Sequence, residues 1–96
     1  MKSQTPGLAT VAVERVQTGV RLEKRLLKVL KALADYHDLS LGDLLEGIVL
    51  HAFDGKTPFG NESLARIAEL KRVFGLTLDS RHAHRLVEKS GREKPS

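Results

Sequence analysis

Apolar and polar positions alternate along residues 16–22, where every second side chain is apolar or β-branched. A period of two with β-branched residues on one side is typical of a strand. The apolar face of this segment consists of Val16, Thr18, Val20 and Leu22. The pattern predicts one short strand, and no second segment of the chain shows a comparable alternation.

Helical periodicity replaces this alternation in the next part of the chain. Apolar side chains recur at intervals of three and four over 23–37, 40–53 and 61–74, which predicts three helices. A shorter fourth helix is predicted over 79–89, where only three residues are apolar. The chain is therefore expected to be mainly α-helical with one short strand.

Capping residues indicate where the predicted helices begin and end. Ser40 is placed as the N-cap of the second helix, with Leu39 and Leu44 spaced for a hydrophobic staple. Asn61 is placed as the N-cap of the third helix. Gly75 follows the last turn of that helix, where a glycine commonly ends the helical backbone.

Composition and charge restrict the class of protein. The chain of 96 residues has no cysteine, which excludes disulfides and thiolate metal sites and fits an intracellular protein. It has no apolar run near the roughly 20 residues that span a bilayer and no apolar leader, so we expect a cytoplasmic protein outside membranes. The net charge of +4, from 16 Lys and Arg against 12 Asp and Glu, favours a polyanionic partner, with nucleic acid first.

A lone strand has no ladder partner within its own chain. Its backbone donors and acceptors would be satisfied if a second copy paired with it about a two-fold axis. Such an antiparallel ribbon would bury the apolar face of both strands and turn outward the residues Arg15, Gln17, Gly19 and Arg21. A two-stranded ribbon fits the major groove of B-DNA, where Arg and Gln bind base edges.

The segment RVQTGVRLEKRLLKVLKALADYHDLSLGDLLEGIVLHAF, residues 15–53, resembles the ribbon-helix-helix family of MetJ, Arc and CopG-type repressors. The resemblance depends on the Val-Arg-Leu end of the strand, on Leu and Ala in the first helix, and on Ser40 between the helices. It implies an obligate homodimer, with one short strand per chain, that binds double-stranded DNA and can form higher-order assemblies on it. Gly19 departs from the family pattern, which has a polar side chain there, so base recognition would depend on Gln17 and Arg21.

The candidate site residues receive their roles from the resemblance together with their positions along the chain. Base contacts are expected from Gln17, Gly19 and Arg21. Phosphate contacts are expected from Arg15, Lys24, Arg25, Ser40, Leu41 and Gly42. The dimer core is expected to contain Val16, Thr18, Val20 and Leu22.

Each of these assignments has a structural alternative. The arginine and glutamine positions could be solvated strand residues, and Gly19 could be a bulge rather than a point of close approach to DNA. Ser40 is a helix cap whether or not it also binds phosphate. The lysines and arginines of the first helix could form an ordinary solvated face.

The domain organisation follows from the same patterns. We expect a flexible N-terminal segment over 1–14, a ribbon-helix-helix domain over 15–55, and a helical extension with a polar tail over 56–96. The extension is expected to pack on the dimer core or to join dimers on DNA. In the alternative, the extension is the toxin-binding part of an antitoxin, and it is loose until the toxin binds.

Enzymatic chemistry finds little support in the sequence. His82 and His84 are two residues apart, which does not place them on one helix face, and no third ligand has a suitable spacing. We therefore expect no catalytic residues, no metal and no cofactor. The predicted function is that of a transcriptional repressor or autoregulating antitoxin, and the alternative is a helical protein-interaction module that does not bind DNA.

Overall fold

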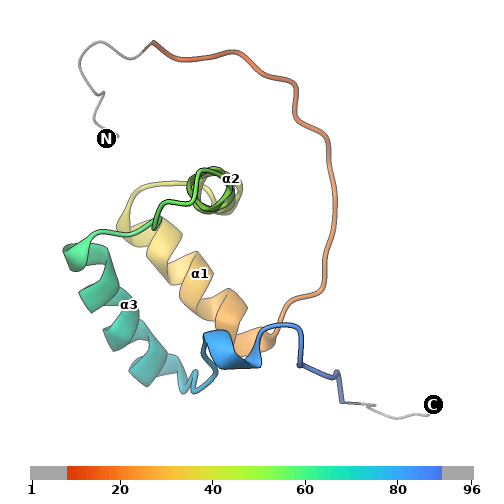
Figure 1. Cartoon of the computed structure of the whole chain (residues 1–96), viewed down its shortest axis with the longest axis vertical. Helices are drawn as coiled ribbons and strands as arrows, with labels where there is room; N and C mark the ends of the chain where they lie inside the picture. Colours follow the sequence, from red (N-terminus) through yellow and green to blue (C-terminus); the bar gives the residue numbers. More distant parts are fainter. Residues whose placement is uncertain (1–8, 90–96) are drawn as a thin grey trace.

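The computed structural model describes residues 9–89 of the chain. It contains three helices, α1 (Lys24–Tyr36), α2 (Leu41–Phe53) and α3 (Asn61–Phe74), followed by a short 3-10 turn, η1 (Ser80–His82). α1 packs against both α2 and α3, while α2 and α3 make no contact with each other in this part of the chain (Figure 1). The three predicted helices are confirmed, and each begins and ends within one residue of its predicted bounds.

α1 forms because a charged cap precedes a regular apolar face. The carboxylate of Glu23 accepts a hydrogen bond from the backbone N–H of Leu26 at 2.8 Å, which satisfies a donor that has no partner inside the helix. The residues that α1 buries, Val29, Leu33 and Ala34, are four and five positions apart and share one face.

α2 begins as its capping residues predict. The Ser40 hydroxyl accepts the backbone N–H of Asp43 at 3.1 Å, so Ser40 is confirmed as the N-cap. Leu44 is buried against α1, and Leu39 packs against the same cluster. The cap and the two leucines fix the angle at which the chain enters α2.

α3 ends on a left-handed residue but begins differently from the prediction. Asn61 is the first residue of the helix rather than its cap, because Gly60 occupies the N-cap position without a side-chain hydrogen bond. Gly75 has φ of 68°, a conformation in which a side chain would be strained. The N–H of Leu76 then donates to the carbonyl of Lys71 at 2.8 Å, and the Leu76 side chain is buried.

The core is small and lies between α1 and its two neighbours. Leu33 is its most buried residue, with 1% of its surface exposed, and it packs with Ala34 and Leu44. Partly buried side chains surround this centre: Leu30, Leu39, Ile48, Phe59, Ile67 and Leu70. Because Ile67 and Leu70 belong to α3, the helical extension packs on α1 of its own chain.

The predicted strand over 16–22 is wrong. Residues 9–22, called here the extended segment, have no regular secondary structure, and residues 9–89 contain no strand. An alternating pattern alone does not form a strand. The backbone N–H and C=O groups of a strand need a neighbouring strand to bond with, and residues 9–89 supply none. The ribbon-helix-helix fold class is therefore contradicted, since it requires this strand, and the described fold is a three-helix, all-helical arrangement.

The predicted fourth helix over 79–89 is also wrong. Asp79 caps only the short turn η1, and the chain leaves helical geometry at Ala83, where ψ is 136°, before His84 with φ of 66°. Leu86 and Val87 are exposed, so the segment has too little apolar surface against the core to stabilise a helix.

Two parts of the predicted organisation lie outside the described residues. These are the first eight residues of the predicted flexible N-terminal segment and the tail after residue 89. Within residues 9–89, no helix is long and apolar enough to cross a membrane.

Candidate nucleic-acid interface

The extended segment runs from the first turn of α1 past α2 without packing on the helices (Figure 1). All its residues are exposed, including the predicted base-contact residues Gln17 and Gly19. A Cβ added at Gly19 would have no heavy atom within 4 Å, so nothing in the described chain obstructs a ligand there.

The four residues predicted to form a dimer core are not buried in the described chain. Val16 is 85% exposed and Val20 is 74% exposed, and Thr18 and Leu22 are exposed as well. The structure therefore keeps these residues together on one segment but does not place them against the helices.

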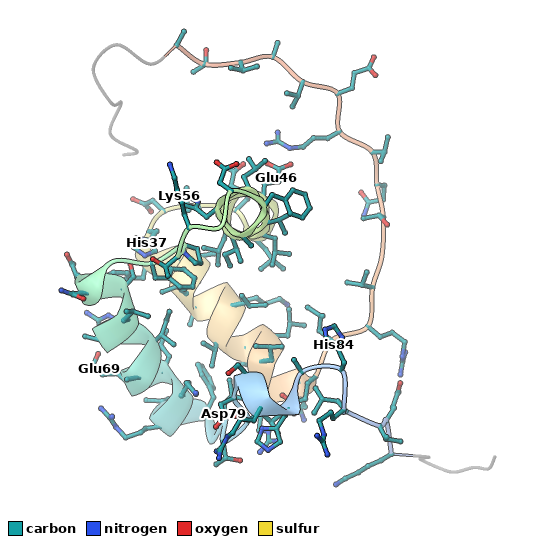
Figure 2. The ribbon with its side chains drawn as sticks, viewed as in Figure 1. His37, Glu46, Lys56, Glu69, Asp79 and His84 are labelled. Carbon is teal, nitrogen blue, oxygen red and sulfur yellow. The ribbon has the colours of Figure 1, made fainter. Side chains whose placement is uncertain are left out.

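Arg15 joins the extended segment to α2. Its Nε and one terminal nitrogen donate to the two carboxylate oxygens of Glu46 at 2.8 and 2.7 Å, and that nitrogen also lies 3.1 Å from Oδ1 of Asp43. Glu46 is labelled in Figure 2 on the surface of α2 that is turned toward the extended segment. The hydrogen bond lowers the pKa of Glu46 and raises the pKa of Arg15.

Arg21 joins the other end of the extended segment to the chain that follows η1. Its guanidinium donates to both carboxylate oxygens of Glu88, with 3.1 Å between Nε and Oε1. The hydrogen bond with Arg21 lowers the pKa of Glu88, and the same contact raises the pKa of Arg21. Figure 1 shows the C-terminal segment passing beside the start of α1, where this contact forms.

The basic residues of α1 divide into two groups. Lys24, Lys28 and Lys31 are exposed at intervals of four and three, so they share one side of the helix. Arg25 is half-buried, and it donates to the carbonyl of Gly75 and to the carboxylate of Glu23, each at 3.0 Å. Arg25 therefore has a structural role at the end of α3. The three lysines are exposed, and the Lys28 ammonium lies over the Phe74 ring, 6.0 Å from its centre.

The start of α2 is a less open anion site than the sequence predicted. The Ser40 hydroxyl is used as the cap, Leu41 is half-buried, and Gly42 is exposed. The carboxylates of Asp43 and Glu46 stand in the first two turns of the helix, where they repel an approaching phosphate. A phosphate at this position would also have to compete for Arg15.

Charge is strongly segregated along the chain. Residues 9–31 contain six Lys and Arg and only two acidic residues, Glu14 and Glu23, a balance of +4 that equals the net charge of all 96 residues. Residues 32–55 contain five acidic residues and neither Lys nor Arg. Residues 56–89 contain seven Lys and Arg and four acidic residues, a balance of +3, so basic regions lie on both sides of the acidic residues 32–55.

α2 carries an apolar surface that the sequence analysis missed. Val49, Leu50 and Phe53 lie on the side opposite the buried Leu44, and Leu50 and Phe53 are 63% and 81% exposed. A projection of α2 at 100° per residue separates these residues from Leu44 and would have indicated two apolar faces.

Two further features of residues 9–89 concern titratable side chains, namely the cap of η1 and a hollow at the end of α3. This part of the chain contains no group of three or more His, Cys, Asp or Glu that could hold a metal ion. His82 instead accepts the backbone N–H of Asp79 at 3.0 Å, as part of the cap of η1. A hollow of about 440 Å³ at the end of α3 is lined by Ala68, Lys71, Arg72, Gly75, Leu76 and Thr77.

Comparisons of the chain with protein-family models, with curated proteins and with solved structures found no match.

Proposed function

We propose that this protein binds double-stranded DNA through the extended segment and the exposed lysines of α1. The observation that carries the proposal is that residues 9–31 combine a balance of +4 with an extended segment whose residues are all exposed. Exposed Lys and Arg that neutralise phosphates provide most of the affinity in sequence-independent DNA binding. Residues 32–55 are acidic, with five Asp and Glu and no Lys or Arg, and residues 56–89 carry a balance of +3.

The residues of this interface divide into those that hold DNA and those that distinguish sequences. Lys24, Lys28 and Lys31 lie along one side of α1 and contact phosphates. Gln17 and Arg21 stand on the extended segment, whose slender backbone enters a groove as basic N-terminal arms do in other DNA-binding proteins. Their amide and guanidinium groups have the donors and acceptors that bind base edges.

We also propose that the DNA-binding form is a homodimer in which the apolar face of α2, formed by Val49, Leu50 and Phe53, meets the same face of a second copy. Large apolar side chains gathered on one helix face mark a protein interface more often than a solvent surface. A two-fold dimer presents two extended segments and two lysine rows, so it binds two half-sites of an operator. Occupation of an operator near a promoter would repress transcription.

A second candidate function is a protein-interaction module without DNA binding. The observation that favours it is the apolar character of the extended segment, where Val11, Val13, Val16 and Val20 are all exposed. These side chains contribute nothing to phosphate binding, but they could be buried by a partner protein.

The test is a titration of a fluorescent DNA duplex with wild-type protein and two matched variants over a range of salt concentrations. Lys24→Ala should reduce the salt slope of log K by about 0.9 and weaken binding to all sequences. Lys56→Ala removes the same charge after α2, outside the proposed interface, and should leave the slope unchanged. Equal effects of the two variants, or no binding at low salt, would contradict the proposal, and the second result would favour the protein-interaction module.

A further inference from the structure

Both arginines of the extended segment are already bound by carboxylates of their own chain. Arg15 is held by Glu46 and Asp43, and Arg21 is held by Glu88. Within residues 9–89, every hydrogen bond between the extended segment and the rest of the chain involves one of these two arginines. These contacts are therefore the attachments that hold the segment along the helices.

The geometry of these contacts matches that of an arginine bound to phosphate. In each pair, two guanidinium nitrogens donate to the two oxygens of one carboxylate. Arginine binds phosphate with the same pair of parallel hydrogen bonds. Glu46 and Glu88 thus occupy the donors that DNA would need.

The contacts are also exposed enough to be exchanged. The side chains of Arg21 and Glu88 are 83% and 64% exposed, and those of Arg15 and Glu46 are 60% and 47% exposed. Ion pairs at such positions are screened by salt and shift an equilibrium by no more than about fivefold each. A polyanion with many charges can displace them.

We propose that Glu46 and Glu88 form an autoinhibitory clasp, in which each carboxylate takes the place of a DNA phosphate and holds the extended segment away from DNA. DNA opens the clasp by exchanging its phosphates or base edges for the two carboxylates. This inference rests on the proposed DNA-binding function and adds a regulatory contact to the same site. Because the two carboxylates belong to different parts of the chain, a change in either α2 or the C-terminal segment alters the affinity for DNA.

The first experiment measures DNA affinity in variants that remove one carboxylate charge at a time. Glu46→Gln and Glu88→Gln should each raise the affinity for a duplex by about two- to fivefold, and the double variant by the product of the two. Glu69→Gln is the control for the change in net charge, because Glu69 pairs with Arg66 on α3 and has no contact with the extended segment. An equal gain in all three single variants would overturn the clasp, since it would show a general charge effect.

A double-mutant cycle tests whether the gain passes through the arginine. In an Arg21→Ala background, Glu88→Gln should have no further effect on the affinity, while Glu46→Gln should keep its full effect. An unchanged gain from Glu88→Gln in that background would overturn the assignment of Glu88 to the clasp.

A measurement without DNA separates the clasp from the function on which it rests. The chain has no cysteine, so Ala12→Cys and Ala65→Cys allow spin labels on the extended segment and on α3. The distance distribution between the labels should broaden in the Glu46→Gln, Glu88→Gln double variant. No broadening would overturn the clasp even if DNA binds, whereas broadening without DNA binding by any variant would overturn the proposed function and with it the regulatory role.

Discussion

The extended segment and the helical body differ in how their sequences determine their conformation. In the body, Glu23 and Ser40 cap their helices with their own side chains, and Leu33 is buried within its own chain. In residues 16–22, the sequence has an equally regular alternation, but no side chain is buried. A periodic pattern therefore specifies a structure only where the same chain provides the surface or the hydrogen-bonding partner that the pattern needs.

The largest expected effect separates the two regions by stability. Leu33→Ala should lower the free energy of unfolding by about 2–5 kcal/mol, because it removes a fully buried side chain and leaves a cavity. Val16→Ala in the extended segment should change it by less than about 0.5 kcal/mol, because Val16 is 85% exposed. Urea denaturation followed by circular dichroism measures the free energy of unfolding of both variants. Equal losses of this free energy would show that the extended segment belongs to the cooperative core.

The next effect concerns the exposed face of α2. Phe53→Asp should weaken self-association by at least about 30-fold, the loss typical of a buried aromatic anchor at an interface. The helical content of the monomer should stay the same, because Phe53 is 81% exposed in the single chain. Sedimentation velocity at several concentrations measures the association, and a variant that dimerises like the wild type would place the dimer contact elsewhere.

A smaller effect is expected where the backbone of the body is left-handed. Gly75→Ala should cost about 1 kcal/mol of unfolding free energy, because φ of 68° is unfavourable for alanine. Gly42→Ala is the matched control: it lies in the first turn of α2, where a new Cβ meets only the Ser40 hydroxyl oxygen at 3.9 Å. This control should stabilise the helix slightly. Thermal unfolding shows whether each variant is more or less stable than the wild type. A change in the same direction for both variants would contradict this explanation of the end of α3.

The smallest effect is a pH dependence at the cap of α1. The backbone hydrogen bond from Leu26 lowers the pKa of Glu23 below its ordinary value near 4.5. The Glu23 carboxylate therefore stabilises the folded state fully above its ordinary pKa. This stabilisation is lost as the pH falls through the lower pKa that Glu23 has in the folded state. Glu23→Gln should lower the melting temperature at pH 7 and differ less from the wild type at pH 3.

Glu14→Gln provides the comparison in the extended segment. Glu14 caps no helix and makes no hydrogen bond within residues 9–89, so this variant should melt like the wild type at both pH values. A Glu23→Gln variant whose deficit stayed constant between pH 7 and pH 3 would show that the carboxylate charge does not stabilise α1.

The sequence predicted the features of the fold that depend on neighbours along the chain. Ser40 and Gly75 were identified as helix boundaries because caps act within three or four residues. The failures involve contacts between distant positions. The strand over 16–22 required a partner that the described chain lacks, and the helix predicted over 79–89 required an apolar surface to cover Leu86 and Val87.

The candidate site shows the same division. The basic character of Lys24 and Arg21 follows directly from the sequence, and their role in DNA binding stays a prediction. The pairing of Arg21 with Glu88 was not predictable, because 67 residues separate them and no local pattern specifies which carboxylate an exposed arginine meets. The role of Arg25 at the end of α3 escaped prediction for the same reason.

The most direct test of the account is an NMR titration of the full chain with a DNA duplex of about 20 base pairs at low salt. Backbone amide shifts should concentrate in the extended segment and in the first turns of α1, around Lys24 and Lys28. α3 should change little, because it carries no part of the proposed interface. Shifts confined to α3, or a spectrum that does not change at saturating DNA, would contradict the claim that residues 9–31 form a DNA-binding surface.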